Sequence, residues 1–98
     1  TGQVVPAAPR SVPDDRTRTL AMYWLDGRLL GWPDNPKRQA YLLDEIVKAF
    51  DGERTYSERE VDAILKGIYE YDHCVVRRAL IDFGYMDRDH GVYVTRAR

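Results

Sequence analysis

The chain has 98 residues, enough for one hydrophobic core but not two, and its net charge of −1 gives the whole molecule no electrostatic reason to seek nucleic acid. Its hydrophobic share of 44% and charged share of 32% exclude a disordered chain, and no apolar run approaches the roughly 20 residues that span a bilayer. The lone cysteine, Cys74, excludes an internal disulfide, so we expect a soluble protein of the reducing cytoplasm that makes no membrane contact.

The N-terminal part of the chain divides into a proline-rich segment, a predicted helix and a predicted extended piece. Residues 1–13 hold three prolines and no periodicity, so we expect them to form a flexible leader, with residues 14–98 as the single domain. Two acids followed by apolar residues predict a short helix over residues 14–25, with negative charge at its positive end. Asp26-Gly27 ends this helix, and a short extended piece is expected over residues 28–32.

The next helix is signalled at both ends. Asn35 is a good N-cap and Pro36 suits the first helical position, while Asp51-Gly52 stops the helix. The helix is expected to bury an apolar stripe made of Leu42, Leu43, Ile46, Val47 and Phe50.

A capping box predicts where the following helix begins. The Ser57 hydroxyl can accept a hydrogen bond from the amide of Glu60, whose carboxylate can accept one from the amide of Ser57. The helix is expected to end near Tyr69, and its apolar residues at helical spacing are Val61, Ile64, Leu65 and Ile68.

A third helix and a hairpin complete the domain. Asp72 can cap the helix and Gly84 permits its left-handed exit, and the stripe expected in the core comprises Val76, Ala79, Leu80 and Phe83. Strands over residues 85–88 and 92–95 then flank the turn Asp89-His90-Gly91, where glycine supplies a positive φ. This order predicts an α+β, mainly helical fold: a winged helix-turn-helix with a short N-terminal helix and extended segment.

Four motifs support the same fold. They are DGRL at 26–29, YSEREVDAIL at 56–65, DHCVVRRALIDFG at 72–84 and RDHGVY at 88–93. On these motifs the chain resembles a bacterial domain of unknown function, number two-zero-eight-seven. The resemblance implies a winged-helix-like module that occurs alone or attached to transcriptional regulators, and it implies no particular function.

Four side chains are candidates for nucleic-acid contact. Arg77 and Arg78 lie on the third helix, which is the recognition helix of a DNA-binding winged helix, and Arg88 and His90 lie on the wing. They could contact phosphates or guanine edges. In the structural alternative, Arg78 pairs with Asp82 four residues on, Arg77 pairs with an acid on a neighbouring element, and the wing tip is only solvated.

Apolar residues outside these stripes are candidates for a protein interface. They are Trp24, Leu29, Leu30, Trp32 and Ile81. We expect some of this surface to meet a partner, most simply a second copy, because two-fold homodimers are the commonest assemblies. The competing expectation is that the N-terminal segment folds over the outward face around Ile81 and completes a monomer.

No constellation of residues indicates catalysis or a cofactor. His73, Cys74 and His90 are too few and too badly spaced for a metal site. Adjacent residues on a helix diverge by about 100°, so His73 and Cys74 are not expected to form a catalytic dyad. We therefore expect no enzyme activity, no cofactor and no small-molecule substrate.

Two function hypotheses follow. The first is a winged-helix regulatory module, a DNA-binding transcriptional regulator that contacts duplex DNA through Arg77, Arg78 and Arg88. The second is a protein-interaction or homodimerisation module without DNA affinity. The near-neutral charge favours the second hypothesis and the expected fold favours the first.

Overall fold

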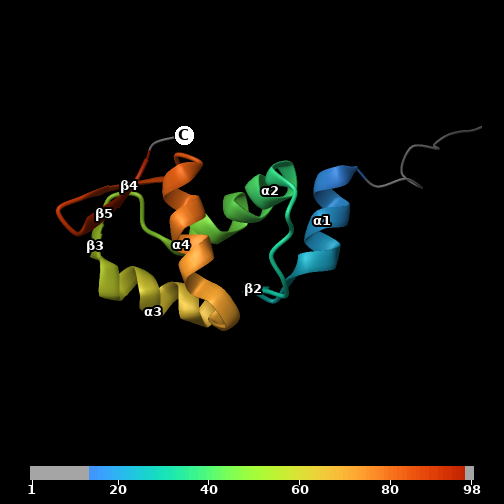
Figure 1. Cartoon of the computed structure of the whole chain (residues 1–98), viewed down its shortest axis with the longest axis horizontal. Coiled ribbons are helices and arrows are strands. Elements are labelled where there is room, and N and C mark those ends of the chain that lie inside the picture. Colours follow the sequence, from blue (N-terminus) through green and yellow to red (C-terminus); the bar gives the residue numbers. More distant parts are fainter. Residues whose placement is uncertain (1–13, 97–98) are drawn as a thin grey trace, which may run out of the picture.

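The computed structural model describes residues 14–96, and the leader expected over residues 1–13 lies outside the described residues. Figure 1 shows the first helix at one end of the molecule and the larger sheet at the other. In chain order the elements are α1 (Asp15–Tyr23), β1 (Trp24–Leu25), β2 (Arg28–Leu29), α2 (Pro36–Ile46), the 3-10 turn η2 (Val47–Ala49), β3 (Thr55–Ser57), α3 (Glu58–Ile68), the 3-10 turn η3 (Glu70–Asp72), α4 (His73–Asp82), β4 (Met86–Asp89) and β5 (Val92–Thr95).

The larger sheet defines the wing. β3, β5 and β4 are antiparallel and lie in that order, so that Tyr93 of β5 is opposite Tyr56 of β3 on one side and Arg88 of β4 on the other. α3 and α4 form the helix-turn-helix, joined through η3, and the β4–β5 hairpin follows them as the wing. The α+β winged-helix-like fold predicted from the sequence is confirmed.

The helices begin where the capping residues predict. The Asn35 side chain accepts hydrogen bonds from the amides of Lys37 and Arg38, at 2.8 and 3.2 Å. Both hydrogen bonds of the capping box between Ser57 and Glu60 are present, at 3.1 and 2.8 Å. These bonds satisfy backbone N–H groups that the first turn of a helix leaves without a partner.

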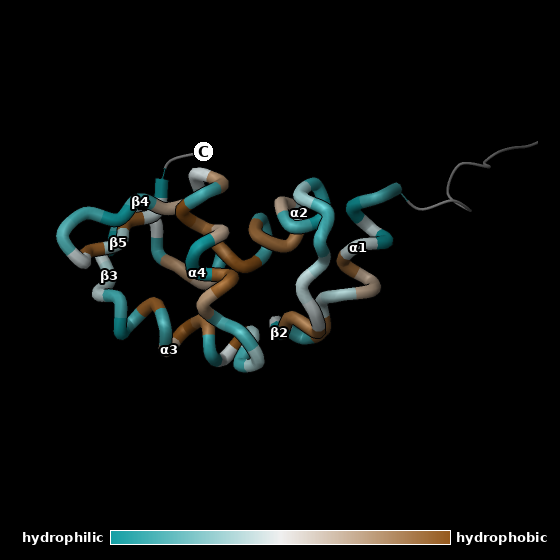
Figure 2. Tube along the Cα trace, in the orientation of Figure 1, coloured by the Kyte–Doolittle hydropathy of each residue, from teal (hydrophilic) through white to brown (hydrophobic). Residues whose placement is uncertain are grey.

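The core lies where α2, α3 and α4 meet the sheet. In Figure 2 hydrophobic positions recur along these helices, whereas the turn of the wing is hydrophilic. The predicted stripes supply most of the core, and Tyr93 and Met86 of the wing close it. Burying one such side chain stabilises the fold by about 1.5–3 kcal/mol. The fully buried stripe residues are Leu42, Leu43, Ile46, Val61, Leu65, Val76 and Leu80.

The end of α4 corrects the predicted core at one position. Phe83, expected in the buried stripe, is 37% exposed because α4 ends at Asp82 and Phe83 is its C-cap. Gly84, at φ +80°, turns the chain so that the amide of Tyr85 donates to the carbonyl of Leu80 at 2.9 Å. This is a Schellman motif, in which the residue after the glycine packs inward. Tyr85, and not Phe83, is therefore the aromatic residue at this end of α4 that enters the core.

A second correction concerns the end of the first helix. The sequence predicts helix to Leu25, but α1 ends at Tyr23, and β1 and β2 form a two-stranded hairpin. Its turn, Asp26-Gly27, has φ of +51° and +78°. Two consecutive positive φ angles are typical of the type I′ turn, which Asp-Gly favours in tight hairpins. Leu29 of this hairpin is buried in the core, where β2 packs on α3.

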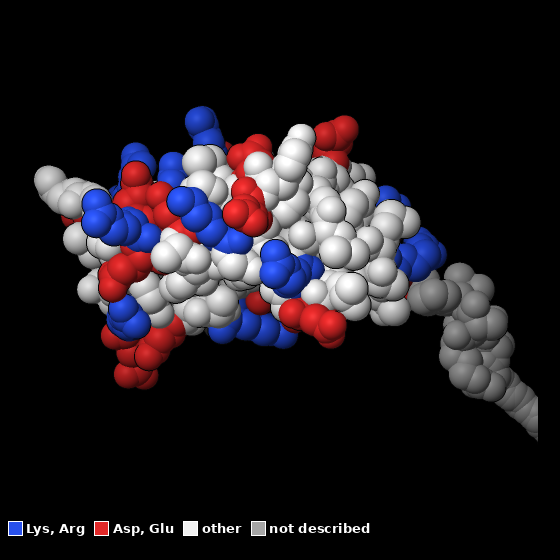
Figure 3. Space-filling model, turned by 90° about the horizontal axis from the view of Figure 1, so that it is seen from below, with Lys and Arg blue, Asp and Glu red and all other residues white. Residues whose placement is uncertain are grey.

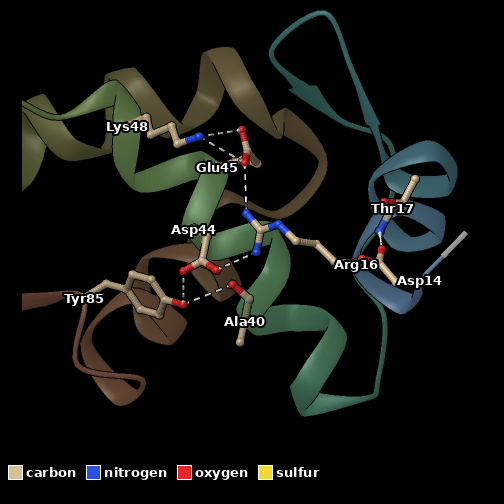
Figure 4. Close-up of polar contacts among 8 residues, drawn as sticks. All are labelled: Asp14, Arg16, Thr17, Ala40, Asp44, Glu45, Lys48 and Tyr85. Atoms are coloured by element: carbon tan, nitrogen blue, oxygen red, sulfur yellow. Dashed lines mark hydrogen bonds and ion pairs between the residues drawn. The ribbon is translucent and has the colours of Figure 1, made fainter. Parts of the chain in front are cut away.

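A polar cluster joins α1 to the rest of the domain. Arg16 of α1 reaches between two acids of α2, with Nη1 2.9 Å from Asp44 and Nη2 3.2 Å from Glu45 (Figure 4). Asp44 also accepts a hydrogen bond of 2.6 Å from the hydroxyl of Tyr85, which contacts the carbonyl oxygen of Ala40 at 3.0 Å. The hydrogen bond to Asp44 raises the pKa of Arg16, so the cation is held in place. One carboxylate thus connects α1 with the start of the wing.

Candidate nucleic-acid interface

A groove of about 410 Å³ lies between α4 and the wing. Its lining brings together three of the four side chains that the sequence nominates for nucleic-acid contact, and it includes Ile81 from the proposed protein interface. The lining residues are Arg77, Arg78, Ile81, Asp82, Arg88 and Tyr93. The Asp72 cap and the Schellman motif fix both ends of α4, and the pairing of β4 with β5 fixes Arg88 opposite Tyr93.

Arg77 is the most enclosed of the three arginines. Its guanidinium donates a hydrogen bond to Asp62 of α3, and both side chains are half-buried. This hydrogen bond is the main reason that the pKa of Arg77 is raised. Arg77 is therefore paired with an acid on a neighbouring element, as the structural alternative predicts. This pair joins α4 to α3.

Arg78 and Arg88 are open to solvent. The side chain of Arg78 is 82% exposed, and its Nε lies 3.4 Å from Oδ2 of Asp82, four residues on. The side chain of Arg88 is 57% exposed, and its Nη1 lies 3.9 Å from Oε1 of Glu58. Exposed pairs of this kind are worth about 0–1 kcal/mol, so both guanidinium groups can leave their carboxylates for another anion.

His90 does not line the groove. It lies in the turn of the wing at φ +53°, and its Nδ1 is 2.7 Å from Oδ1 of Asp89. Both side chains are almost fully exposed. His90 is placed in the turn at the outer end of the β4–β5 hairpin.

The surface carries both signs of charge. Figure 3 shows the molecule from below, with basic and acidic side chains interspersed on that face and no continuous basic area. Within the groove the same mixture occurs at close range, because each arginine has a carboxylate within 4 Å. Glu58 and Asp62 were not predicted from the sequence as partners of these arginines. The available signal is their i, i+4 spacing, which puts both on one side of α3.

The residues predicted for a protein interface differ in how exposed they are. Leu29 is wrong for this role because it is buried in the core. Trp24 and Trp32 are half-buried, and Leu30 is exposed together with Met22 and Leu25. α1 packs on α2 and β2 packs on α3, while Ile81 lines the groove.

The described residues hold little that could support other chemistry. Between residues 14 and 96, no three His, Cys, Asp or Glu side chains are grouped so as to hold a metal ion, and no helix is long and apolar enough to cross a membrane. Cys74 Sγ does lie 3.7 Å from His73 Nε2, closer than the divergence of neighbouring helix positions suggests. Asp62 approaches that same nitrogen, at 3.8 Å, whereas a catalytic triad uses both ring nitrogens.

Comparison with known proteins places the chain in a family. Residues 28–95 match the family described as "Uncharacterized protein conserved in bacteria (DUF2087)". The matched segment runs from β2 to the end of β5, so it includes the whole helix-turn-helix and wing. No curated protein and no solved structure matches the chain. The chain belongs to this bacterial family.

Proposed function

We propose that this member of the DUF2087 family is a winged-helix regulatory module of the bacterial cytoplasm, and that it binds duplex DNA through the groove between α4 and the wing. The observation that carries the proposal is the convergence of Arg77, Arg78 and Arg88 on that groove. In winged helices, the second helix of the helix-turn-helix and the wing are the elements that approach DNA.

The three arginines have different roles in the proposed complex. Arg78 and Arg88 supply the exposed guanidinium groups and contact phosphates or, for Arg78, a guanine edge. Arg77 lines the groove and positions α4 through its pair with Asp62. His90 at the tip of the wing is a further phosphate contact. So few contacts predict micromolar affinity at low salt and weak sequence discrimination.

Titration of a fluorescent mixed-sequence duplex, followed by anisotropy, tests this proposal. We expect binding at about 50 mM salt, with a log–log salt dependence of roughly −2 to −3, because each phosphate that is neutralised contributes about −0.9. Arg78→Gln and Arg88→Gln should each weaken binding by about 3- to 10-fold. Arg28→Gln, on the β1–β2 hairpin, removes the same charge outside the groove and should change affinity by less than about 2-fold.

The proposal fails under a clear condition. Folded wild-type protein at tens of micromolar that does not bind mixed duplex at about 50 mM salt has no sequence-independent DNA affinity. Equal losses from Arg28→Gln and Arg88→Gln would contradict the groove as the binding site and attribute the binding to net charge alone.

A second candidate function rests on a different observation. Met22, Leu25 and Leu30 are large apolar side chains, each more than half exposed, and they lie on α1, on β1 and directly after β2. Exposed apolar residues that gather in this way mark protein contacts. The alternative function is therefore a protein-interaction or homodimerisation module, for which DNA affinity is not needed.

A further inference from the structure

We infer that Asp62 and Glu58 of α3 mask Arg77 and Arg88 of the groove, so that these carboxylates limit its affinity for DNA phosphates. This inference rests on the proposed function and deepens it, because it assigns the affinity of the site to two acidic residues outside the recognition helix and the wing.

The geometry puts both acids against the groove. Glu58 and Asp62 are four residues apart on α3, so they share one side of the helix, the side that meets α4 and the wing. Asp62 holds Arg77 by a hydrogen bond. Glu58 lies beside Arg88, and its Oε1 accepts a hydrogen bond of 3.1 Å from the hydroxyl of Tyr93.

A phosphate must compete with these carboxylates. Carboxylate and phosphate oxygens accept from the same guanidinium donors, so an arginine held by an acid is released before it binds DNA in full. A carboxylate that stays in place also repels the phosphate at close range. The charge of Glu58 reaches beyond Arg88, because it adds to the effect of Asp62 in raising the pKa of Arg77.

The two acids differ in how tightly they hold. The pair of Asp62 with Arg77 is half-buried and joins α3 to α4, so removing Asp62 would also loosen the fold. The pair of Glu58 with Arg88 is longer and exposed on both sides. Glu58 is therefore the acid whose removal frees a cation without disturbing the core. Glu58→Gln keeps an oxygen that can accept from Tyr93.

The decisive experiment compares Glu58→Gln with wild type and with Asp26→Asn in the duplex titration described above. Asp26→Asn also removes one negative charge, but in the turn of the β1–β2 hairpin, where the positive φ suits asparagine. We expect Glu58→Gln to bind duplex about 3- to 10-fold more tightly than wild type at about 50 mM salt, because Arg88 no longer has to leave a carboxylate before it contacts a phosphate. Asp26→Asn should stay within about 2-fold of wild type.

A double variant identifies the arginine that is released. In Glu58→Gln/Arg88→Gln the gain should disappear, because the freed cation is absent. If wild type binds but Glu58→Gln binds no more tightly than Asp26→Asn, masking is wrong and the proposed function stands. If Glu58→Gln binds where wild type does not, masking is supported and the DNA binding proposed for the wild-type chain is wrong. If neither binds, both the masking and the proposed function are wrong.

Discussion

The capping box of α3 is the clearest residue-scale signal in the chain. The Ser57 hydroxyl accepts from the Glu60 amide at 3.1 Å, at the start of the helix that carries both masking acids. Replacing Ser57 with Ala should lower the free energy of unfolding by about 0.5–2 kcal/mol, because the amide loses its acceptor. Urea denaturation measures the loss. Ser57→Thr keeps the hydroxyl and should lose much less, and equal stability of the Ala variant and wild type would contradict the role of the cap.

The second hydrogen bond of the capping box, from the Ser57 amide to Glu60, makes the free energy of unfolding depend on pH. The Ser57 amide donates to the charged carboxylate of Glu60, and this bond, with the nearby charge of Arg54, lowers the pKa of Glu60. The folded pKa lies below the unfolded one, so the stabilisation is complete above the unfolded value and is lost as the pH falls through the folded value. Wild type should therefore exceed Glu60→Gln in unfolding free energy at about pH 7, and by less at about pH 3.

Urea titrations of both proteins at the two pH values measure this difference. Glu53→Gln, in the loop before β3, controls for the loss of one negative charge. A gap between wild type and Glu60→Gln that widens toward acid pH would contradict the assigned sign.

A hydrogen-bond partner that is near in the sequence can be predicted from residue types more readily than one that is far away. Asn35, Ser57 and Asp72 cap helices by accepting from backbone amides no more than three residues away, so sequence alone predicts these bonds. Arg77 could be predicted to need an acid, but its partner Asp62 lies 15 residues away across the helix-turn-helix. Only the packing of α3 against α4 decides which acid meets it. The contacts of Asp62 and Glu58 with the arginines of the groove therefore could not be assigned from the sequence alone.

At the scale of elements, α1 depends on its polar attachment to α2. Thr19 is the one residue of α1 that is fully buried, Leu20 and Tyr23 pack only partly against the core, and Arg16 adds polar contacts to Asp44 and Glu45 (Figure 4). We expect Arg16→Met to speed hydrogen exchange of the α1 amides while the β3–β5–β4 sheet keeps its protection, because elements with few apolar contacts open separately.

Hydrogen exchange followed by mass spectrometry tests this expectation. Arg18→Met is the matched control, since Arg18 lies on the same helix and forms an ion pair with Asp15 within α1. Unchanged exchange of α1 in Arg16→Met would show that its apolar contacts suffice. Faster exchange throughout the sheet would show that α1 is part of the cooperative core.

Two elements differ from the sequence prediction for identifiable reasons. Trp24 and Leu25 continue the apolar character of α1, which suggested helix, but Asp26-Gly27 is a strong signal for a type I′ hairpin and turns the chain immediately. Phe83 continues the helical spacing of α4, but Gly84 ends the helix and brings Tyr85 inward. In both cases a turn that contains glycine ends the helix, although apolar residues continue beyond it at helical spacing. The order of helices and strands is as predicted.

At the scale of the whole molecule, two surfaces of different chemistry lie on different elements. The groove between α4 and the wing carries paired charges, while α1 and the β1–β2 hairpin expose apolar side chains. Alternation along the hairpin puts Leu25 and Leu30 on its outer side, because Trp24 and Leu29 face the domain. In the described chain, three of the six exposed large hydrophobic residues lie between residues 22 and 30. This surface is separate from the groove, so both can be occupied at once.

Self-association through the hairpin is the last prediction. Leu25 and Leu30 are 58% and 57% exposed, whereas Trp24 and Trp32 are half-buried, so the leucines are the residues to replace. A two-fold dimer would cover both hairpins with one contact, and dimeric winged helices use such symmetry to reach paired half-sites on DNA. We expect light scattering to show a mass that rises above 11.4 kDa toward twice that value as concentration approaches about 100 µM. Leu25→Ser/Leu30→Ser should abolish the rise, while Val92→Thr, which changes an exposed apolar residue on the wing, should leave it unchanged. A constant monomer mass for wild type over this range would exclude the dimer. The exposed apolar residues of the hairpin would then be a candidate contact surface for a different protein.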